Sequence, residues 1–279
     1  MSNNILKGKR GIIFGALDNK SIAWKVAQHA YLEGAKFTLT NAPIALRMGS
    51  IDDLAKETKS KVIAADATST DDLKNLFEIS MQELGGKIDF ILHSIGMSVN
   101  VRKGRKYYEQ NYDWNMKGYD VSALSFHKTI QTAWELDAMN EWGSIIGLSY
   151  IAAQRVFHTY NDMADNKAML ESIARSFGYH YGTKRNVRIN TISQSPTETT
   201  AGSGVAGFDG FYRFANDLSP LGNASSDDCA DYCISLFSDY TRKVTMQNLF
   251  HDGGFSFTGM SETAMETYLK VMEEENNNK

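Results

Sequence analysis

Cysteine is almost absent from this chain of 279 residues, which contains only Cys229 and Cys233. The two lie four positions apart in a segment with helical patterning, and neighbouring turns of one helix give poor geometry for a disulfide. No other cysteine or histidine nearby in the sequence completes a tetrahedral zinc set. We therefore interpret both as small buried side chains, and we expect neither a disulfide framework nor a metal site.

Long hydrophobic runs and a strong charge of either sign are also absent. No run of about 18 apolar residues occurs, so we expect no membrane-spanning helix. Residues 1–15 lack the apolar core and small-residue cleavage site of a signal peptide, which favours a cytoplasmic protein. The formal net charge of −4 gives no general attraction toward nucleic acid or an anionic membrane. Any bound anion must therefore find local donors.

Proline is rare as well, with three residues, and no stretch rich in proline, glycine and serine divides the chain. Short apolar runs alternate with longer segments of helical periodicity, which is typical of an α/β protein with a parallel sheet. The pattern predicts one domain over residues 1–279, built on a Rossmann-type doubly wound parallel sheet. Predicted strands occupy 10–15, 35–40, 62–66, 87–96, 143–149, 186–193 and part of 244–254, and predicted helices occupy 21–34, 70–86, 160–181 and 225–239.

Small and polar residues follow several predicted strands, at the edge where parallel sheets bind nucleotides. Gly15 ends the first strand and Ser21 opens the next helix, although the glycine-rich G-x-G-x-x-G pattern is absent. Asp66 ends the third strand, where a carboxylate can accept a hydrogen bond from an adenine amino group. Gly96 ends the fourth, where the missing side chain admits a close ligand. The first turn alone fits an ordinary strand-to-helix connection, but the three strand ends together favour a nucleotide site.

Tyr160 and Lys167 enclose six residues in the sequence YNDMADNK. On an α-helix this spacing would place both side chains on one face, about 10 Å apart along the axis. Such pairs also arise by chance, so the spacing alone does not identify an active site. Its meaning depends on the motifs that accompany it.

Those motifs are Gly15 with Ser21-Ile22-Ala23, Asp66, HSIG at 93–96, SYIAAQR at 149–155, Tyr160 with Lys167, SPTETTA at 195–201 and HDGGFS at 251–256. In this combination, over about residues 7–260, the sequence resembles the divergent short-chain dehydrogenases that act as enoyl-acyl-carrier-protein reductases in bacterial fatty-acid synthesis. Ordinary short-chain dehydrogenases have a glycine-rich first turn and a Tyr-x3-Lys pair instead. The resemblance implies a Rossmann fold, acyl carrier protein as a partner, and a homotetramer.

The resemblance also implies roles for individual residues. Tyr160 matches the catalytic tyrosine, Lys167 matches the lysine that holds the nicotinamide ribose, and Tyr150 matches a second active-site tyrosine. Ser98 matches a position that binds substrate through its backbone. The implied cofactor-binding positions are Gly15, Ser21, Ile22, Ala42, Asp66, Ala67, Ile95, Gly96, Lys167, Thr197, Glu198, Thr199, Thr200 and Ala201.

The second predicted strand bears on the choice of cofactor. No Asp or Glu ends it to bind the ribose 2′-hydroxyl, and Ala42 stands where relatives have a polar side chain near the adenosine ribose. Arg47 could in principle reach a 2′-phosphate. We expect NADH, with NADPH possible. Other departures from the family pattern are Ser195 in place of glycine, Thr197 in place of isoleucine, and Asp165 and Asn166 in place of small apolar residues.

The implied reaction delivers a hydride to the β-carbon of an enoyl thioester, so that negative charge develops on the thioester oxygen. Tyr160 is the candidate hydrogen-bond donor to that oxygen, while Lys167 orients the ribose and adds positive charge. In ketone reduction the acceptor oxygen lies on the carbon that receives the hydride, so a tyrosine–lysine pair spread over two turns fits the enoyl case better. The alternatives are a reductase of ketones or 3-oxoacyl thioesters, and a nucleotide-binding sensor without turnover.

Two segments near the end of the chain complete the prediction. Residues 197–217 contain glycines interleaved with Phe208, Phe211 and Tyr212, which favours a flexible substrate lid over an acyl chain. Residues 273–279 are polar, and we expect a frayed tail. His93 ends an apolar strand, and we expect it to be structural rather than a catalytic base.

Overall fold

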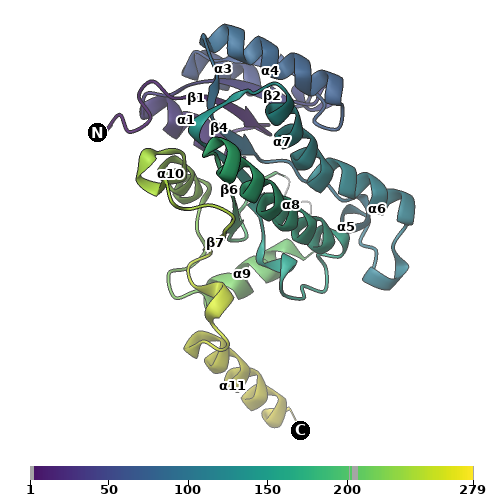
Figure 1. Cartoon of the computed structure of the whole chain (residues 1–279). Coiled ribbons are helices and arrows are strands. Elements are labelled where there is room, and N and C mark those ends of the chain that lie inside the picture. Colours follow the sequence, from purple (N-terminus) through teal and green to yellow (C-terminus); the bar gives the residue numbers. More distant parts are fainter. Residues whose placement is uncertain (1–2, 201, 203–206, 279) are drawn as a thin grey trace.

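Parallel strands form the centre of the protein in the computed structural model, which describes residues 3–200, 202 and 207–278. Within these residues, seven strands form one sheet in the order β3-β2-β1-β4-β5-β6-β7. The predicted single-domain Rossmann-type fold is confirmed (Figure 1). The strand order reverses between β1 and β4, and such sheets bind ligands at the carboxyl ends of the strands beside this point. The strands are β1 (Arg10–Phe14), β2 (Lys36–Asn41), β3 (Lys61–Ala64), β4 (Ile88–His93), β5 (Met139–Ser149), β6 (Arg188–Gln194) and β7 (Asn248–His251).

Helices cover both faces of the sheet because each carries an apolar side that must be buried. One face packs against α1 (Ile22–Leu32), α3 (Ile51–Thr58) and α10 (Ser226–Phe237). The other packs against α4 (Thr70–Leu84), α7 (Ser125–Glu135) and α8 (Asp162–Arg185). The remaining helices are α2 (Pro43–Leu46), α5 (Val99–Arg102), α6 (Tyr112–Tyr119), α9 (Phe208–Leu218) and α11 (Glu262–Asn277), with a π-helical turn (Asp120–Leu124) between α6 and α7.

The strands bury side chains on both faces, as their near-continuous apolar sequences predict. Ile12 and Ile13 of β1 are both fully buried, yet they belong to the cores on opposite sides of the sheet. Cys229 and Cys233 on α10 are fully buried free thiols in one of these cores, which confirms their interpretation as small core side chains. Across the described ranges, no helix has the length and apolar composition needed to cross a bilayer.

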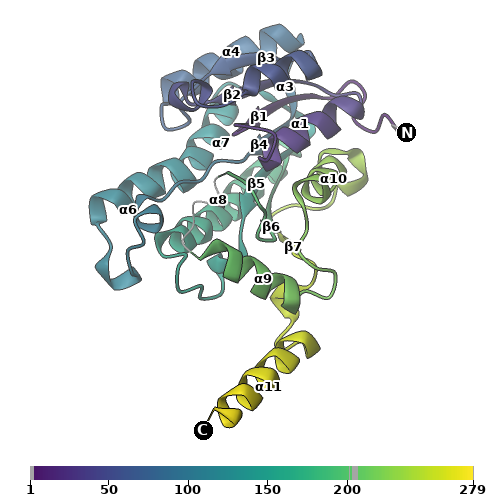
Figure 2. The ribbon, with the colours of Figure 1, turned by 180° about the vertical axis from the view of Figure 1, so that it is seen from behind.

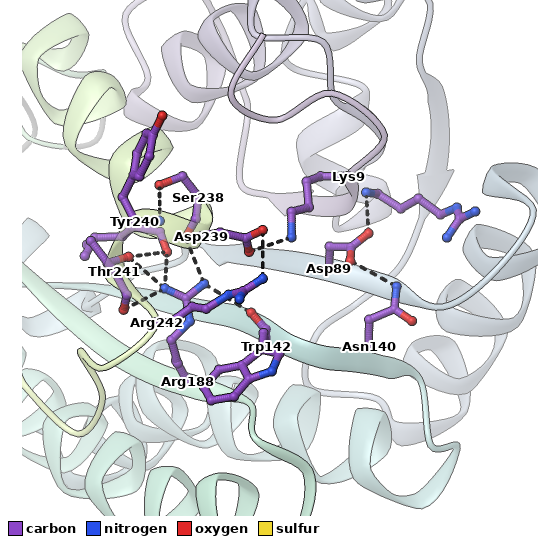
Figure 3. Close-up of polar contacts among 12 residues, drawn as sticks. Lys9, Asp89, Asn140, Trp142, Arg188, Ser238, Asp239, Tyr240, Thr241 and Arg242 are labelled. Atoms are coloured by element: carbon purple, nitrogen blue, oxygen red, sulfur yellow. Dashed lines mark hydrogen bonds and ion pairs between the residues drawn. The ribbon is translucent and has the colours of Figure 1, made fainter. Parts of the chain in front are cut away.

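A closed polar network lies at the amino-terminal edge of the sheet (Figure 3). Its centre is Arg188, the first residue of β6, which is only 2% exposed. Close by, Asp239 pairs with Lys9 at 2.9 Å. The network ties the start of β6 to the end of α10 and the turn that follows it. The acceptors of the Arg188 guanidinium are the carbonyl oxygens of Trp142, Leu236, Ser238 and Thr241 and the hydroxyl of Thr241.

Two segments differ from the sequence prediction. Residues 208–218, expected to belong mostly to a flexible lid, form α9, because Phe208 and Phe211 find buried aromatic partners around Tyr150. Residues 273–277, expected to fray, continue α11, whose composition of Glu, Met, Leu and Lys favours a helix. Helix α11 extends away from the body of the protein in both views (Figures 1 and 2).

Candidate active site

A pocket opens at the carboxyl ends of β4, β5 and β6, between α9 and the segment that follows β4. The predicted site residues that line it are Ile22, Ile95, Gly96, Ser98, Tyr150, Tyr160, Lys167, Thr197 and Thr199. Gly15, Ser21, Ala42, Asp66, Ala67, Glu198 and Thr200 do not line it, and Ala201 lies outside the described residues. The three residues expected to be catalytic therefore share one cavity, and several expected cofactor positions follow neighbouring strand ends.

Gly15 brings the end of β1 against the segment that follows β4. Its φ is 92°, and a Cβ there would lie 2.0 Å from the carbonyl oxygen of Ser94. Only glycine tolerates both the backbone conformation and this close approach. The sequence motif therefore has a direct structural cause, whether or not a ligand is bound beside it.

The first turn uses its polar side chains internally. Ser21 makes no side-chain capping bond to α1; its hydroxyl donates to the Asp18 carbonyl at 2.7 Å and accepts from the Leu17 amide at 3.3 Å. Thr200 donates to the Asp18 carboxylate at 2.5 Å, which ties the segment after β6 to this turn. Ser21 therefore shapes the turn, and the amide groups at the start of α1 are the donors best suited to an anion.

The outer strand ends carry the remaining predicted positions. Asp66 follows β3, and its Oδ1 accepts from both the amide and the hydroxyl of Thr68, at 2.9 and 2.7 Å. Ala42 precedes the short helix α2, and Arg47 at the end of that helix is exposed. One carboxylate oxygen of Asp66 thus holds the local turn, while these residues stay apart from the catalytic pocket.

Tyr160 lies two residues before α8 and not within it. The intervening Asn161 has φ 44° and ψ −133°, which lies outside the right-handed helical region and costs a residue other than glycine about 1–3 kcal/mol. The predicted start near residue 160 is therefore two residues early, because Asp162 is the first residue that can be helical. Tyr160 and Lys167 reach one pocket through this turn, and the expected shared face of a single helix does not apply.

Lys167 is buried, with 7% of its surface exposed, and its Nζ donates to the Leu148 carbonyl of β5 at 2.6 Å. Burial lowers the pKa of Lys167 to about 8, and the nearby Glu171 carboxylate opposes this effect. At neutral pH the lysine therefore still carries a positive charge in the pocket. Lys167 lines the pocket, so this charge lies beside the cavity.

Tyr150 and Tyr160 pack against each other, with ring centroids 5.0 Å apart. Burial raises the pKa of both phenols well above the ordinary value. Both therefore remain protonated at neutral pH and act as hydrogen-bond donors. The Tyr150 hydroxyl is buried without a hydrogen-bond partner among the described residues. A ligand oxygen in this pocket could accept from it.

Glu171 is a residue that the sequence prediction missed. It is 4% exposed, and its carboxylate accepts from the Ser149 hydroxyl at 2.6 Å and from the side-chain amide of Gln154 at 3.2 Å. It therefore fixes the chain on both sides of Tyr150 and compensates the charge of Lys167. The available signal was its position four residues after Lys167, one helical turn along the same face.

Ser98 contacts the start of α8 through its side chain. Its hydroxyl accepts from the Val101 amide at 3.0 Å, which caps α5, and donates to the fully buried Asp162 at 2.6 Å. The hydroxyl proton of Ser98 is therefore already used, and its backbone contact with substrate stays a prediction. Of the unusual residues before the lysine, Asp165 lies near the exposed Tyr107 hydroxyl, and Asn166 is fully buried beside Met163.

His93 is fully buried between the rings of Phe14 and Phe126, and its Nε2 lies 2.8 Å from the Ser125 hydroxyl. Burial, assisted by the charge of Lys167, lowers the pKa of His93 to about 3. The side chain is therefore neutral, as expected of a structural histidine.

Comparisons with known proteins show similarity over nearly the whole chain. The family model described as Enoyl-(Acyl carrier protein) reductase matches residues 15–256. The NADH-dependent enoyl-acyl-carrier-protein reductase FabI of Rickettsia bellii is 33% identical over 267 residues, which cover 94% of this chain and 99% of that protein. The structure of a FabI–NADH complex from Alistipes finegoldii superposes with a TM-score of 0.94 at 63% identity, covering 95% of this chain and 94% of that one. The enoyl-acyl-carrier-protein reductase (NADH) of Aquifex aeolicus gives a TM-score of 0.84 at 30% identity, with coverage of 92% and 99%.

Proposed function

The chain belongs to the enoyl-(acyl carrier protein) reductase family, and we propose that it reduces trans-2-enoyl thioesters on acyl carrier protein with NADH. The product is the saturated acyl thioester, formed in the last step of the fatty-acid elongation cycle. The observation that carries the proposal is the pocket in which Tyr150, Tyr160 and Lys167 lie together at the carboxyl edge of the sheet.

The residues around the pocket fit a nicotinamide dinucleotide. A Cβ at Gly96 would meet Met163 at 3.4 Å and Lys167 at 3.8 Å, so the missing side chain leaves room between the strand end and these residues. When bound, NADH supplies the hydride that reduces the double bond. We propose that the cofactor is held by Gly15, Ser21, Ile22, Ala42, Asp66, Ala67, Ile95, Gly96, Lys167 and the segment 197–201.

Tyr160 is proposed to donate a hydrogen bond to the thioester oxygen, on which negative charge develops as the β-carbon is reduced. A neutral phenol in a buried site suits this role, because a donor in a water-excluded pocket stabilises charge more strongly than one in water. Tyr150, whose hydroxyl has no partner among the described residues, is the second candidate donor to the substrate. Ser98 would contact substrate through its backbone.

Lys167 is proposed to hold the nicotinamide ribose and to place a positive charge near the developing anion. Its hydrogen bond to the Leu148 carbonyl orients the ammonium group. The Glu171 carboxylate raises the pKa of Lys167, so a larger fraction of the lysine is protonated. Phe208 and Phe211 of α9 line the other side of the pocket, where they would cover an acyl chain. The segment 197–217 would thus serve as the substrate lid.

One assay tests this function against its two alternatives. Cofactor absorbance at 340 nm is followed with a crotonyl thioester and, separately, with an acetoacetyl thioester. We expect NADH oxidation with the crotonyl thioester. Oxidation with only the acetoacetyl thioester would favour a ketone reductase, and cofactor binding without any turnover would favour a sensor. Repeating the assay with NADPH tests the choice of cofactor, for which the NADH-dependent relatives support NADH, whereas Arg47 after α2 is the candidate contact for a 2′-phosphate.

We also propose a cytoplasmic homotetramer. The family resemblance supports the tetramer. Sedimentation velocity at micromolar protein concentration should give about four times the chain mass of 31.1 kDa. A monomeric species that retains full activity would contradict the assembly.

A further inference from the structure

Four cations lie within five residues at the end of α5 and directly after it. They are Arg102, Lys103, Arg105 and Lys106, which we call the basic segment. All four are exposed. In the part of the chain that the structure describes, no ion pair is formed between any of them and a carboxylate, although the chain as a whole carries a net charge of −4. Arg105 lies over the Trp114 ring and Lys106 over the Tyr108 ring, but no carboxylate among the described residues neutralises this local excess of positive charge.

The basic segment is held at the mouth of the active-site pocket. Arg102 lines the pocket together with Ser98 and Val101. The Arg105 amide donates to the Asn100 carbonyl at 3.0 Å, and the Asn161 side chain donates to the Arg105 carbonyl. Because Asn161 directly follows Tyr160, the backbone that carries these charges is fastened to the turn that carries the proposed catalytic tyrosine.

The opposite wall of the pocket mouth has a different character. Helix α9 presents aromatic side chains to the pocket, and its charged residues are Asp209, Arg213 and Asp217. Arg213 lies 3.7 Å from Asp217, so its charge is already paired. Of the described residues on these two walls, those of the basic segment are therefore the ones that offer positive charge without a paired carboxylate. Next to it, Tyr107 and Tyr108 are 59% and 78% exposed, and tyrosine and arginine are among the residues enriched in protein interfaces.

We propose that the basic segment docks an acidic surface of the carrier protein that delivers the enoyl thioester. This rests on the proposed function, because it assumes a carrier-linked substrate. Arg102 alone lines the pocket, whereas Lys103, Arg105 and Lys106 lie outside its lining. A single phosphate on the arm of the substrate could engage one such charge, but an array of four requires an extended anionic surface. Opposite charges at a pocket mouth also accelerate encounter and fix its orientation.

The test is the double variant K103E/K106E, which leaves every pocket-lining residue unchanged. The matched control is K7E/K36E, which makes the same charge change at two exposed lysines near the amino-terminal edge of the sheet. For each protein, kcat and KM are measured with a crotonyl group on acyl carrier protein, on coenzyme A and on pantetheine. These substrates present an acidic protein with a phosphate, phosphates alone, and no charge.

We expect K103E/K106E to raise KM for the carrier-linked substrate by about tenfold, with kcat unchanged. The KM for crotonyl-pantetheine should stay unchanged, and the control should match the wild type with all three substrates. Raised salt should increase the KM of the wild type for the carrier-linked substrate toward that of the variant, because exposed charges are screened over about 10 Å at 0.1 M. The milder variant K103A/K106A should show a smaller effect in the same direction.

Each other outcome overturns the proposal. An equal rise in KM for coenzyme A and carrier protein would assign the segment to the phosphate arm, and a rise with pantetheine would assign it to the pocket itself. No change with the carrier would exclude docking here. A changed sedimentation coefficient in K103E/K106E would make the segment a contact between copies of this chain. If the wild type reduces none of the three crotonyl thioesters, the proposed function fails first, so the two failures are distinguishable.

Discussion

Buried polar side chains are treated differently at the two edges of the parallel sheet. At the amino-terminal edge, the Arg188 guanidinium has five acceptors from the surrounding backbone and Thr241, and only its Nε lacks a partner. At the carboxyl edge, the Tyr150 hydroxyl and the Ser193 hydroxyl have no partner among the described residues. Unpaired buried atoms also occur at the amino-terminal edge, at Arg188 Nε and at Ser144 Oγ, whose residue pairs with Arg188 in the strand register. The Tyr150 hydroxyl differs from them because it lines the pocket, so the carboxyl edge is the one that offers an unused donor to a ligand.

Replacing Tyr160 by phenylalanine should produce the largest loss of activity. The variant loses the proposed donor to the thioester oxygen, so kcat should fall on the order of 100-fold or more, with an unchanged melting temperature. The control is Tyr179→Phe on the exposed side of α8, which should keep its kcat. Full activity of Tyr160→Phe would contradict the proposal that Tyr160 donates a hydrogen bond to the thioester oxygen.

Replacing Arg188 by methionine tests the other edge. Several buried acceptors would lose their donor, so the free energy of unfolding should fall by about 3 kcal/mol, while kcat per folded molecule stays unchanged. Arg242→Met is the control, because Arg242 is half-exposed and pairs with Asp239 at the surface; it should cost less than about 1 kcal/mol. Urea unfolding followed by circular dichroism measures both. Equal losses would contradict a special role for the buried network.

Replacing Gly96 by alanine should weaken NADH binding at the carboxyl edge without lowering the stability of the fold. The new Cβ makes only ordinary contacts with Met163 and Lys167, so the fold should be retained, but the added methyl group enters the proposed cofactor space. The KM for NADH should rise about tenfold. Gly15→Ala should instead lower the melting temperature, because its Cβ would overlap the Ser94 carbonyl at a φ of 92°. An unchanged KM in Gly96→Ala would place the cofactor elsewhere.

Replacing Glu171 by glutamine should have the smallest effect and a distinctive pH dependence. The Glu171 carboxylate raises the pKa of Lys167, which burial lowers to about 8. Without the carboxylate charge this pKa should fall further, so the lysine loses its proton at lower pH. The alkaline limb of log(kcat/KM) should therefore move to lower pH by up to about one unit. Asp165→Asn, on the same helix, is the control and should leave this limb in place.

Much of the fold was predictable because its signals are local. Seven apolar strand segments and the covering helices α1, α4, α8 and α10 follow from hydrophobic periodicity, and Gly15 follows from the strand-to-helix turn. The covering helices α3 and α7 were not predicted. The start of α8 was not predictable to the residue, since the positive φ of Asn161 depends on contacts with the distant segment that carries Arg105. Helix α9 was missed because its aromatic side chains pack against residues around Tyr150, which lie far away in the sequence.

The candidate site was predictable only where a motif carried it. Tyr150, Tyr160 and Lys167 were found through the family resemblance, and the structure places them in one pocket. Glu171 was missed, because a glutamate one turn after a lysine is usually an exposed surface pair. Ser21 matched a cofactor-binding position; its hydroxyl is bonded inside the turn, and its contact with a cofactor stays a prediction.

The sequence by itself determined the class of fold, the absence of a disulfide framework, and the residue types at the ends of the strands, because apolar periodicity and turn chemistry act over a few residues. Only the tertiary structure decided the electrostatic state of those residues. Burial keeps the two phenols protonated and brings the pKa of Lys167 to about 8, and neither effect exists until distant segments exclude water from the pocket.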